Sequence, residues 1–223
     1  MEKNDFLISC DEVGSLHFPR WNELPEFELY MDQVIALAEK YLSVLTPDHK
    51  VPITSSMINN YVKSGALPPP KNKKYNRTHL ALLMIICSMK SVMEISSISD
   101  IVQQSVASSS IEEVLDSFAQ MYENTVSVAA KKAKLAVSAS ASDHIFSAVA
   151  IENALHASAA RTVAMYAYGM IATKTEPSEE EKEKTKAEKK AEKKAEKKAE
   201  KAERKAEKIK EEEIKANPEE TNA

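Results

Sequence analysis

Cysteine, glycine and long apolar runs are all scarce in this sequence, and each scarcity excludes a class of protein. The two cysteines, Cys10 and Cys87, are too few for a disulfide framework, so a cytoplasmic location is expected. No apolar run approaches the roughly 20 residues that a membrane-spanning helix needs. The opening MEKNDF has neither a basic start nor an apolar stretch, so no export signal is expected.

Turn-forming residues are missing from a long central part of the chain. Only three glycines occur, at Gly14, Gly65 and Gly169, and the stretch from Lys71 to Tyr168 contains neither glycine nor proline. Sheets need turns, and turns favour those two residue types. The sequence therefore predicts an all-α fold.

Residue patterns that support catalysis are also scarce. The five histidines lack metal-ligand spacing, the cysteines form no CxxC pair, and no glycine-rich phosphate loop is present. Glu152 and His156 are four residues apart, which is more typical of a surface pair than of an acid–base dyad. We therefore expect no enzyme, no metal site and no cofactor.

What the sequence does contain is a series of segments with helical periodicity. Residues 1–22, which include Gly14 and Pro19, are predicted to form an irregular arm. Pro25 is expected near the first turn of a helix. The apolar positions of that helix, which ends before the break TPDHKVP, are Leu29, Val34, Leu37, Tyr41 and Leu42.

Two further helices joined by a proline-rich elbow are predicted next. The first begins after Thr54, a good N-cap, and ends near Gly65, where a left-handed residue suits a helix end. Its apolar stripe consists of Met57, Ile58, Tyr61 and Val62. LPPP then runs extended, and Asn76 is placed to cap a helix. The inward face of that helix holds Leu80, Leu83, Met84 and Cys87, and a short fourth helix is expected around SSISDIVQQ.

Two serine-rich joints organise the rest of the helical part. After SSS at 108–110, Ser110 and Glu113 have the spacing of a capping box, and SASASD at 138–143 is the second joint. The last helix is rich in alanine, so it can pack closely against a partner in its own chain or in a second subunit. Its apolar stripe consists of Ile151, Leu155, Val163, Tyr166 and Met170.

The composition changes abruptly after Ala172. Residues 174–223 consist mostly of Lys, Glu and Ala, and the 16 basic and 16 acidic side chains there cancel. The four-residue repeat drifts by about 40° per repeat around a helix, so it provides no fixed apolar seam. We expect a solvated, partly helical spacer or a disordered tail. A nucleic-acid-binding tail is the alternative.

Charge is distributed unevenly, although the chain as a whole carries a formal charge of −4. Residues 1–48 have ten acidic and three basic side chains. Residues 49–93 have no acidic side chain and seven basic ones: Lys50, Lys63, Lys71, Lys73, Lys74, Arg77 and Lys90. Such a local patch attracts phosphates whatever the total charge is. The alternative is a solvated charged face.

The residue types on the helix after Thr54 make this patch a candidate DNA-binding site. Asn can pair with adenine in the major groove, and Ser can donate a hydrogen bond to a base or a phosphate. The elbow would hold its charges at low entropic cost because its prolines are rigid. Tyr75 is placed either to pack against the helices or to contact a phosphate. The candidates are Ser55, Ser56, Asn59, Asn60, Lys63, Lys71, Lys73, Lys74, Tyr75 and Arg77.

The order of these segments resembles two known families. The series QVIALAEKY, ITSSMINNYVKSGALPPP, KNKKYNRTHLALLMIICSMK and ISSISDIV resembles the helix-turn-helix and wing of MerR-type regulators. Asn59, Asn60 and Tyr61 stand where that family usually shows Arg-Tyr-Tyr. More closely, FPRWNELPEFELYMDQVI, TSSMINNYVKSGALPPP and KKYNRTHLALLMII resemble bacterial proteins with domain of unknown function 1836. The resemblance covers about residues 17–105.

Together these features lead to a hypothesis about domains and function. The resemblance implies a MerR-like winged helix-turn-helix domain at 23–105. The periodicity and composition of the rest predict a helical dimerisation or sensing region at 106–173 and the charged tail at 174–223. The expected function is a sequence-specific transcriptional regulator that binds double-stranded DNA as a homodimer, with the effector unknown. The alternative is a protein-interaction module whose basic face binds an acidic protein.

Overall fold

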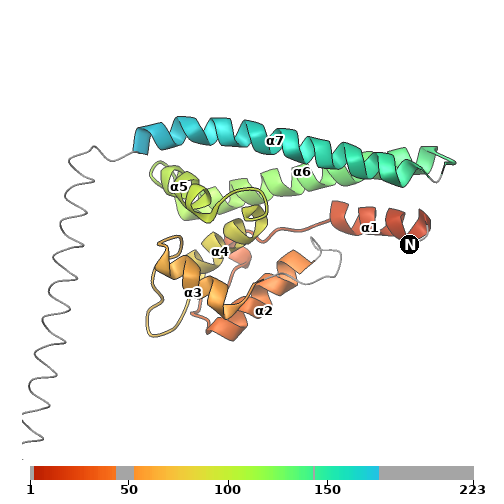
Figure 1. The fold of residues 1–223 in the computed structure, drawn as a ribbon. Coiled ribbons are helices and arrows are strands. Elements are labelled where there is room, and N and C mark those ends of the chain that lie inside the picture. Colours follow the sequence, from red (N-terminus) through yellow and green to blue (C-terminus); the bar gives the residue numbers. More distant parts are fainter. Residues whose placement is uncertain (1–2, 44–52, 143, 176–223) are drawn as a thin grey trace, which may run out of the picture. The chain divides into compact units, whose positions relative to one another are not determined.

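The computed structural model describes residues 3–43, 53–142 and 144–175. Over these residues the chain forms α-helices, one 3-10 turn and two isolated bridges but no strand, which confirms the all-α prediction (Figure 1). The chain divides into two units, residues 1–173 and residues 174–223. The predictions for the TPDHKVP break, for Lys50 and for the tail fall outside the described residues, except for the end of the last helix. The elements in chain order are α1 (Lys3–Gly14), η1 (Trp21–Glu23), α2 (Met31–Leu42), α3 (Ser55–Lys63), α4 (Arg77–Met89), α5 (Ile95–Val106), α6 (Ile111–Ala139) and α7 (Ile145–Thr175).

The prediction of an irregular arm at the start is wrong for Lys3–Gly14, which form α1. This helix lies along α6, more than 100 residues away in sequence. Gly14 allows the close approach, because a Cβ there would lie 3.2 Å from the Cβ of Ala130. The Lys134 ammonium also forms an ion pair with Asp11. Contacts this distant leave no periodic signal in the local sequence, so the helix could not be predicted from it.

The helix expected to start near Pro25 begins later, at Met31. Leu29, which was expected on the apolar face of that helix, is instead extended and pairs with Tyr75 in an antiparallel bridge. Its N–H and C=O both bond to Tyr75, each at 2.8 Å. This tertiary pairing satisfies the backbone of residue 29 outside a helix.

The predicted starts of α3, α4 and α6 are confirmed. Thr54 and Asn76 accept hydrogen bonds from the N–H groups of Met57 and His79, at 3.3 and 3.2 Å. The Ser110 hydroxyl accepts from Glu113 N–H at 3.2 Å, and the Glu113 carboxylate accepts from Ser110 N–H at 3.0 Å. Each cap satisfies donors that a helix leaves unpaired at its N-terminus, and each involves residues only three apart.

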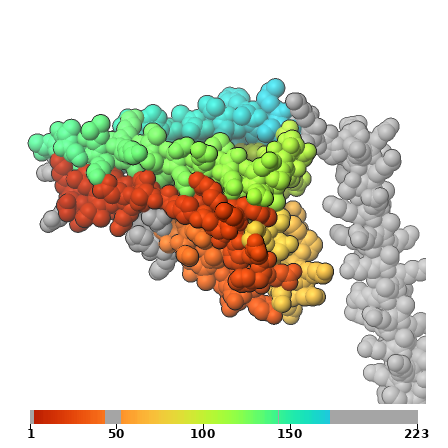
Figure 2. All heavy atoms as spheres, turned by 180° about the vertical axis from the view of Figure 1, so that it is seen from behind, coloured from red at the N-terminus to blue at the C-terminus, as the bar shows by residue number. Residues whose placement is uncertain are grey.

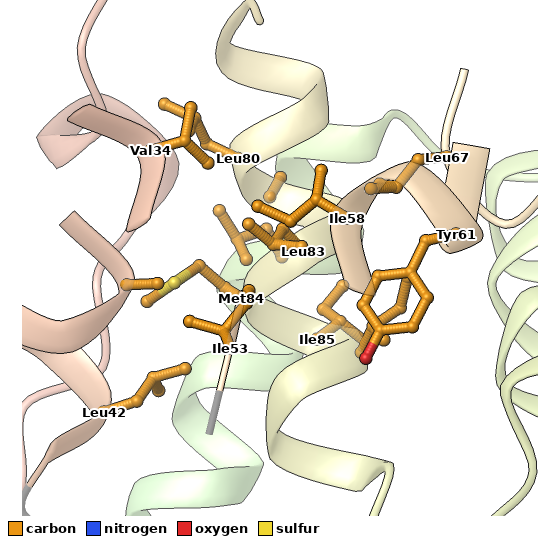
Figure 3. Close-up of a cluster of buried hydrophobic side chains, with 14 of the residues drawn as sticks. Val34, Leu42, Ile53, Ile58, Tyr61, Leu67, Leu80, Leu83, Met84 and Ile85 are labelled. Atoms are coloured by element: carbon orange, nitrogen blue, oxygen red, sulfur yellow. The ribbon is translucent and has the colours of Figure 1, made fainter. Parts of the chain in front are cut away.

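The core of the domain surrounds α4, which packs against α2, α5 and α6. The predicted inward residues Leu80, Leu83 and Met84 are buried, whereas Cys87 is only partly buried. Ile58 of α3 is fully buried beside them, and Figure 3 shows these side chains converging between the helices. The core therefore fixes the orientation of α3, whose other face is left for solvent.

A network of charged groups fastens the segment before η1 to α6. The Glu123 carboxylate accepts from Phe18 N–H at 2.8 Å and from the Arg20 guanidinium at 2.6 and 3.1 Å. The Asp116 carboxylate accepts from Trp21 N–H at 2.7 Å. Desolvation by burial acts to raise the pKa of Glu123. The hydrogen bonds from Arg20 and Phe18 outweigh it, so the pKa of this carboxyl group is below its usual value. Residues 18–21 are thereby held next to α6.

The second joint is where it was predicted, since α6 ends at Ala139 and α7 starts at Ile145. From there α7 returns along α6, with α6 between α1 and α7 in both views (Figures 1 and 2). The far part of α7 reaches α5, where the Tyr168 hydroxyl donates to Asp100 at 2.7 Å. The predicted apolar stripe of α7 does not face the core, because its five residues are 61–78% exposed.

Candidate nucleic-acid interface

Helix α3 has one buried and one exposed face. Ile58 and Tyr61 are buried, and Met57 and Val62 pack against the same core. The exposed face contains only small, amide or basic side chains, which are Ser55, Ser56, Asn59, Asn60 and Lys63. These are the five candidates predicted on this helix, and the structure brings them together on one surface. No acidic side chain lies within α3.

The end of α3 turns the chain sharply into the elbow. Gly65 adopts φ +80°, a left-handed conformation that costs glycine little. Ser64 N–H donates to Asn60 C=O at 2.9 Å, and Leu67 N–H donates to Tyr61 C=O at 3.0 Å. Leu67 is buried, so the elbow leaves the domain from a fixed point before the three prolines.

The basic part of the elbow is a tight hairpin. Lys71 and Lys74 form an antiparallel bridge, with Lys74 N–H donating to Lys71 C=O at 2.9 Å. The two residues between them, Asn72 and Lys73, have φ of 51° and 61°, and positive values at both positions are typical of a type I′ turn. Lys71, Asn72 and Lys73 are exposed at its tip. Figure 2 shows this segment, in gold, at the edge of the domain.

Asn72 is an exposed polar residue at this tip that the sequence-based candidates omit. A signal for it was present in the sequence. KNKK places one asparagine in a two-residue connection, and asparagine is favoured in such turns because it tolerates positive φ. The pairing partner of the hairpin base, Leu29, lies more than 40 residues earlier and could not be inferred from spacing.

Two of the candidate residues are used mainly to hold the hairpin. Tyr75 is 3% exposed, and its ring packs edge-on against His79 with centroids 5.4 Å apart, so of the two roles considered for it the structure shows packing. Arg77 stacks on Trp21, with its guanidinium 5.3 Å from the ring centroid, and forms an ion pair with Glu26 at 3.1 Å. Its side chain is 17% exposed.

The remaining basic candidate, Lys74, is half-buried. Its ammonium lies over the Tyr30 ring, 5.4 Å from the centroid. Because Leu29 pairs with Tyr75, the acidic residues Glu26 and Glu28 also come close to the base of the hairpin. Residues 49–93 contain no acidic side chain, but the folded surface at the base of the hairpin does include acidic side chains from residues 26 and 28. Of the basic candidates that the structure describes, the exposed ones are Lys63 on α3 and Lys71 and Lys73 at the hairpin tip.

His79 connects the start of α4 to the elbow. Its side chain is 6% exposed, and Asn76 N–H donates to its Nδ1 at 3.1 Å. Burial lowers the pKa of His79, although the carbonyls of Pro68 and Pro69 and the charge of Glu28 act in the opposite direction. Its neutral form is therefore favoured in the folded state.

The low pKa of His79 predicts a pH dependence of stability. Since the folded-state pKa is below the ordinary value of about 6.5, the unfolded chain binds more protons between those two pH values. The free energy of unfolding should be constant above that range and should decrease as the pH falls from about 6.5 towards the folded-state pKa. Urea titrations of the wild type and of H79Q across pH 5 to 8 would test this. An equal decrease in H79Q would show that another group is responsible.

Two other features, metal sites and membrane-spanning helices, were sought in the described part of the chain. Within it, no group of three or more His, Cys, Asp or Glu side chains could hold a metal ion. A search of the same residues also finds no helix with the length and apolar character needed to cross a membrane. The surface formed by α3 and the hairpin tip is the candidate site at which the predicted serine, asparagine and lysine side chains are exposed.

Comparison with known proteins identifies a family for part of the chain. Residues 19–125 match the family described as "Domain of unknown function (DUF1836)". No curated protein and no solved structure matches the chain. The matched region extends from just before η1 into α6. It includes α3, the hairpin and Glu123 of α6, which bonds to Phe18 and Arg20. This similarity covers residues 19–125, just under half of the chain.

Proposed function

We propose that this protein is a sequence-specific DNA-binding transcriptional regulator. The observation that carries the proposal is the surface described above, in which the exposed face of α3 and the hairpin tip together present serine, asparagine and lysine. In this proposal α3 enters the major groove and Lys71 and Lys73 contact the phosphates beside it. The resemblance to the helix-turn-helix and wing of MerR-type regulators supports the same placement.

The chemistry of the α3 face suits base recognition. An α-helix fits the major groove of B-DNA, where an asparagine amide can bond to both N6 and N7 of adenine. Asn59 and Asn60 are exposed on this face, and Ser55 and Ser56 lie at its N-terminal end. Backbone N–H groups at a helix N-terminus favour phosphate, so the N-terminal end of this face can also contribute to DNA binding.

The geometry of the hairpin suits backbone contact. The bridge to Leu29, the buried ring of Tyr75 and the three prolines hold the tip in one conformation. Little conformational entropy is then lost when Lys71 and Lys73 meet phosphates. The same rigidity fixes the position of the tip relative to α3, to which it is connected through buried Leu67.

The test of the proposal is selection of fragments bound by the full chain from a random duplex library at near-physiological salt. We expect enrichment of a defined sequence. Salt-sensitive binding without enrichment would reduce the surface to a nonspecific phosphate site. No binding, together with stoichiometric recovery of one acidic protein after nuclease treatment, would favour the protein-interaction alternative.

Asn59→Ala should relax sequence preference more than it weakens binding overall. Loss of a bidentate contact to a base costs about 1–3 kcal/mol of discrimination. Competition binding with the selected duplex and a scrambled duplex would measure the ratio of the two affinities. Asn124→Ala, which removes an exposed asparagine from α6, is the matched control. An equal loss of affinity for both duplexes in N59A would argue against base reading by this residue.

A further inference from the structure

A cavity opens on the surface where α4, α5 and α6 meet. Its volume is about 510 Å³, within the roughly 300–1,000 Å³ that is typical of small-molecule sites. Its inner wall includes Ile85 of α4 and Val102 of α5, which are 1% and 7% exposed, together with partly buried Phe118 of α6. The three helices thus leave an apolar space of the size that a small organic molecule fills.

The inner wall is held in shape by the core. The Phe118 ring lies edge-on to Phe18, with centroids 5.4 Å apart, and stacks on Tyr122 at 5.7 Å. Ile85 and Val102 belong to the same core cluster as Phe18. A wall that is already ordered loses little conformational entropy when a ligand binds against it.

The outer part of the cavity is lined by serine hydroxyls, from Ser105, Ser108, Ser109 and Ser117. Ser105 Oγ donates to the Ile101 carbonyl at 2.9 Å, and Ser108 Oγ donates to the Ser105 carbonyl at 3.2 Å. A hydroxyl has one hydrogen to donate and two lone pairs that accept, so these two serines are left as acceptors. The hydroxyls of Ser109 and Ser117 can rotate to take either role. The rim therefore suits a ligand group that donates hydrogen bonds.

The charge at the rim favours the same kind of group. Among the described residues that line the cavity, only Glu113 carries a charge, and Lys90 is not a lining residue although it follows Met89, which is. One oxygen of the Glu113 carboxylate accepts from Ser110 N–H at 3.0 Å, and Glu113 N–H is taken by the Ser110 hydroxyl at 3.2 Å. The capping box therefore uses these two backbone donors and places a negative charge beside the cavity.

We propose that this cavity binds a small apolar molecule that carries an amine. In this proposal the apolar body lies against the wall formed by Ile85, Val102 and Phe118, and the amine faces the serine rim and the Glu113 carboxylate. An ammonium group has donors and no acceptor, so it complements a rim of acceptors with one negative charge. The site uses no residue of α3 or of the hairpin and does not depend on the proposed function.

Methionine methyl groups can report on binding here, because Met89 and Met121 line the cavity and Met31 of α2 does not. The full chain with isotope-labelled methionine methyls would be titrated with phenylbutylamine, phenylbutanol or phenylbutyrate to millimolar concentration and followed by NMR. The three probes share an apolar body and differ in their end group. We expect the amine to shift the Met89 and Met121 signals saturably and to leave the Met31 signal in place. Its dissociation constant should be roughly tenfold below that of the carboxylate, which meets the like charge of Glu113.

Three results of this titration would overturn the proposal. Equal affinities for the amine and the carboxylate would show that the rim does not select the end group. A shift of Met31 as large as that of Met89 would show nonspecific adsorption of the probes. The absence of any shift at millimolar amine would show that the cavity is not a site for this class of ligand.

Glu113→Gln tests the role of the charge without removing the cap, because the glutamine amide oxygen can still accept from Ser110 N–H. It should weaken amine binding by roughly three- to tenfold and leave alcohol binding unchanged. Glu112→Gln is the matched control, since Glu112 is exposed beside it and does not line the cavity. Equal losses in E113Q and E112Q would indicate general charge attraction and would contradict the site.

Ser117→Phe tests the location, because its ring would occupy the opening of the cavity from the exposed side of α6. Amine binding should be lost, whereas the helical circular dichroism and urea unfolding should not change, since Ser117 is exposed. Undiminished binding in S117F would place the probe elsewhere. A chain that binds the amine but selects no DNA would contradict only the proposed function.

Discussion

Replacing Lys71 and Lys73 together with alanine is expected to weaken binding to every duplex by roughly 10- to 100-fold at near-physiological salt. Both ammonium groups are exposed at the tip of a rigid hairpin, so each can neutralise one phosphate. Loss of two such contacts should reduce the slope of log affinity against log salt by about two. Binding isotherms on the selected and scrambled duplexes at several salt concentrations would measure both quantities.

Two other variants make this result interpretable. Lys131→Ala removes an exposed lysine from α6 and should leave affinity and salt slope unchanged. Arg77→Ala should behave differently from both, because its guanidinium stacks on Trp21 and pairs with Glu26. We expect R77A to lower the free energy of unfolding as well as affinity. If the double lysine variant bound like the wild type, the hairpin tip would not contact the backbone.

Replacing Phe18 with alanine is expected to lower the free energy of unfolding by about 3–5 kcal/mol. The side chain is fully buried, and its ring lies 5.4 Å from those of Phe118 and Tyr122 in an aromatic cluster on α6. Its loss would leave a cavity there and would weaken the attachment of residues 18–21, which Glu123 also holds. Urea unfolding followed by circular dichroism would measure the change.

The chain offers a matched control for this variant. Phe27 lies nine residues further along and is 68% exposed, so Phe27→Ala should change the free energy of unfolding by less than about 0.5 kcal/mol. Comparable losses in F18A and F27A would mean that the burial of Phe18 does not reflect its contribution to stability.

The sequence was sufficient where the determining contacts are local. Thr54, Asn76 and Ser110 each cap a helix through atoms three residues away, and Gly65 ends α3 through its own φ. The exposed face of α3 was predictable for the same reason, because the apolar stripe of one helix defines which side remains for solvent. Neither conclusion needs a distant part of the chain.

The rest was decided by contacts between residues far apart in sequence. Docking on α6 makes residues 3–14 helical, and pairing with Tyr75 keeps Leu29 out of α2. The sequence predicted Arg77 as a DNA-contacting cation, but in the fold its guanidinium stacks on Trp21 and pairs with Glu26. The sequence by itself determined the starts of α3, α4 and α6 and the end of α3, because those depend on neighbours within about one turn. Only the tertiary structure decided which charged and apolar side chains stay exposed, because burial depends on what the whole chain brings together.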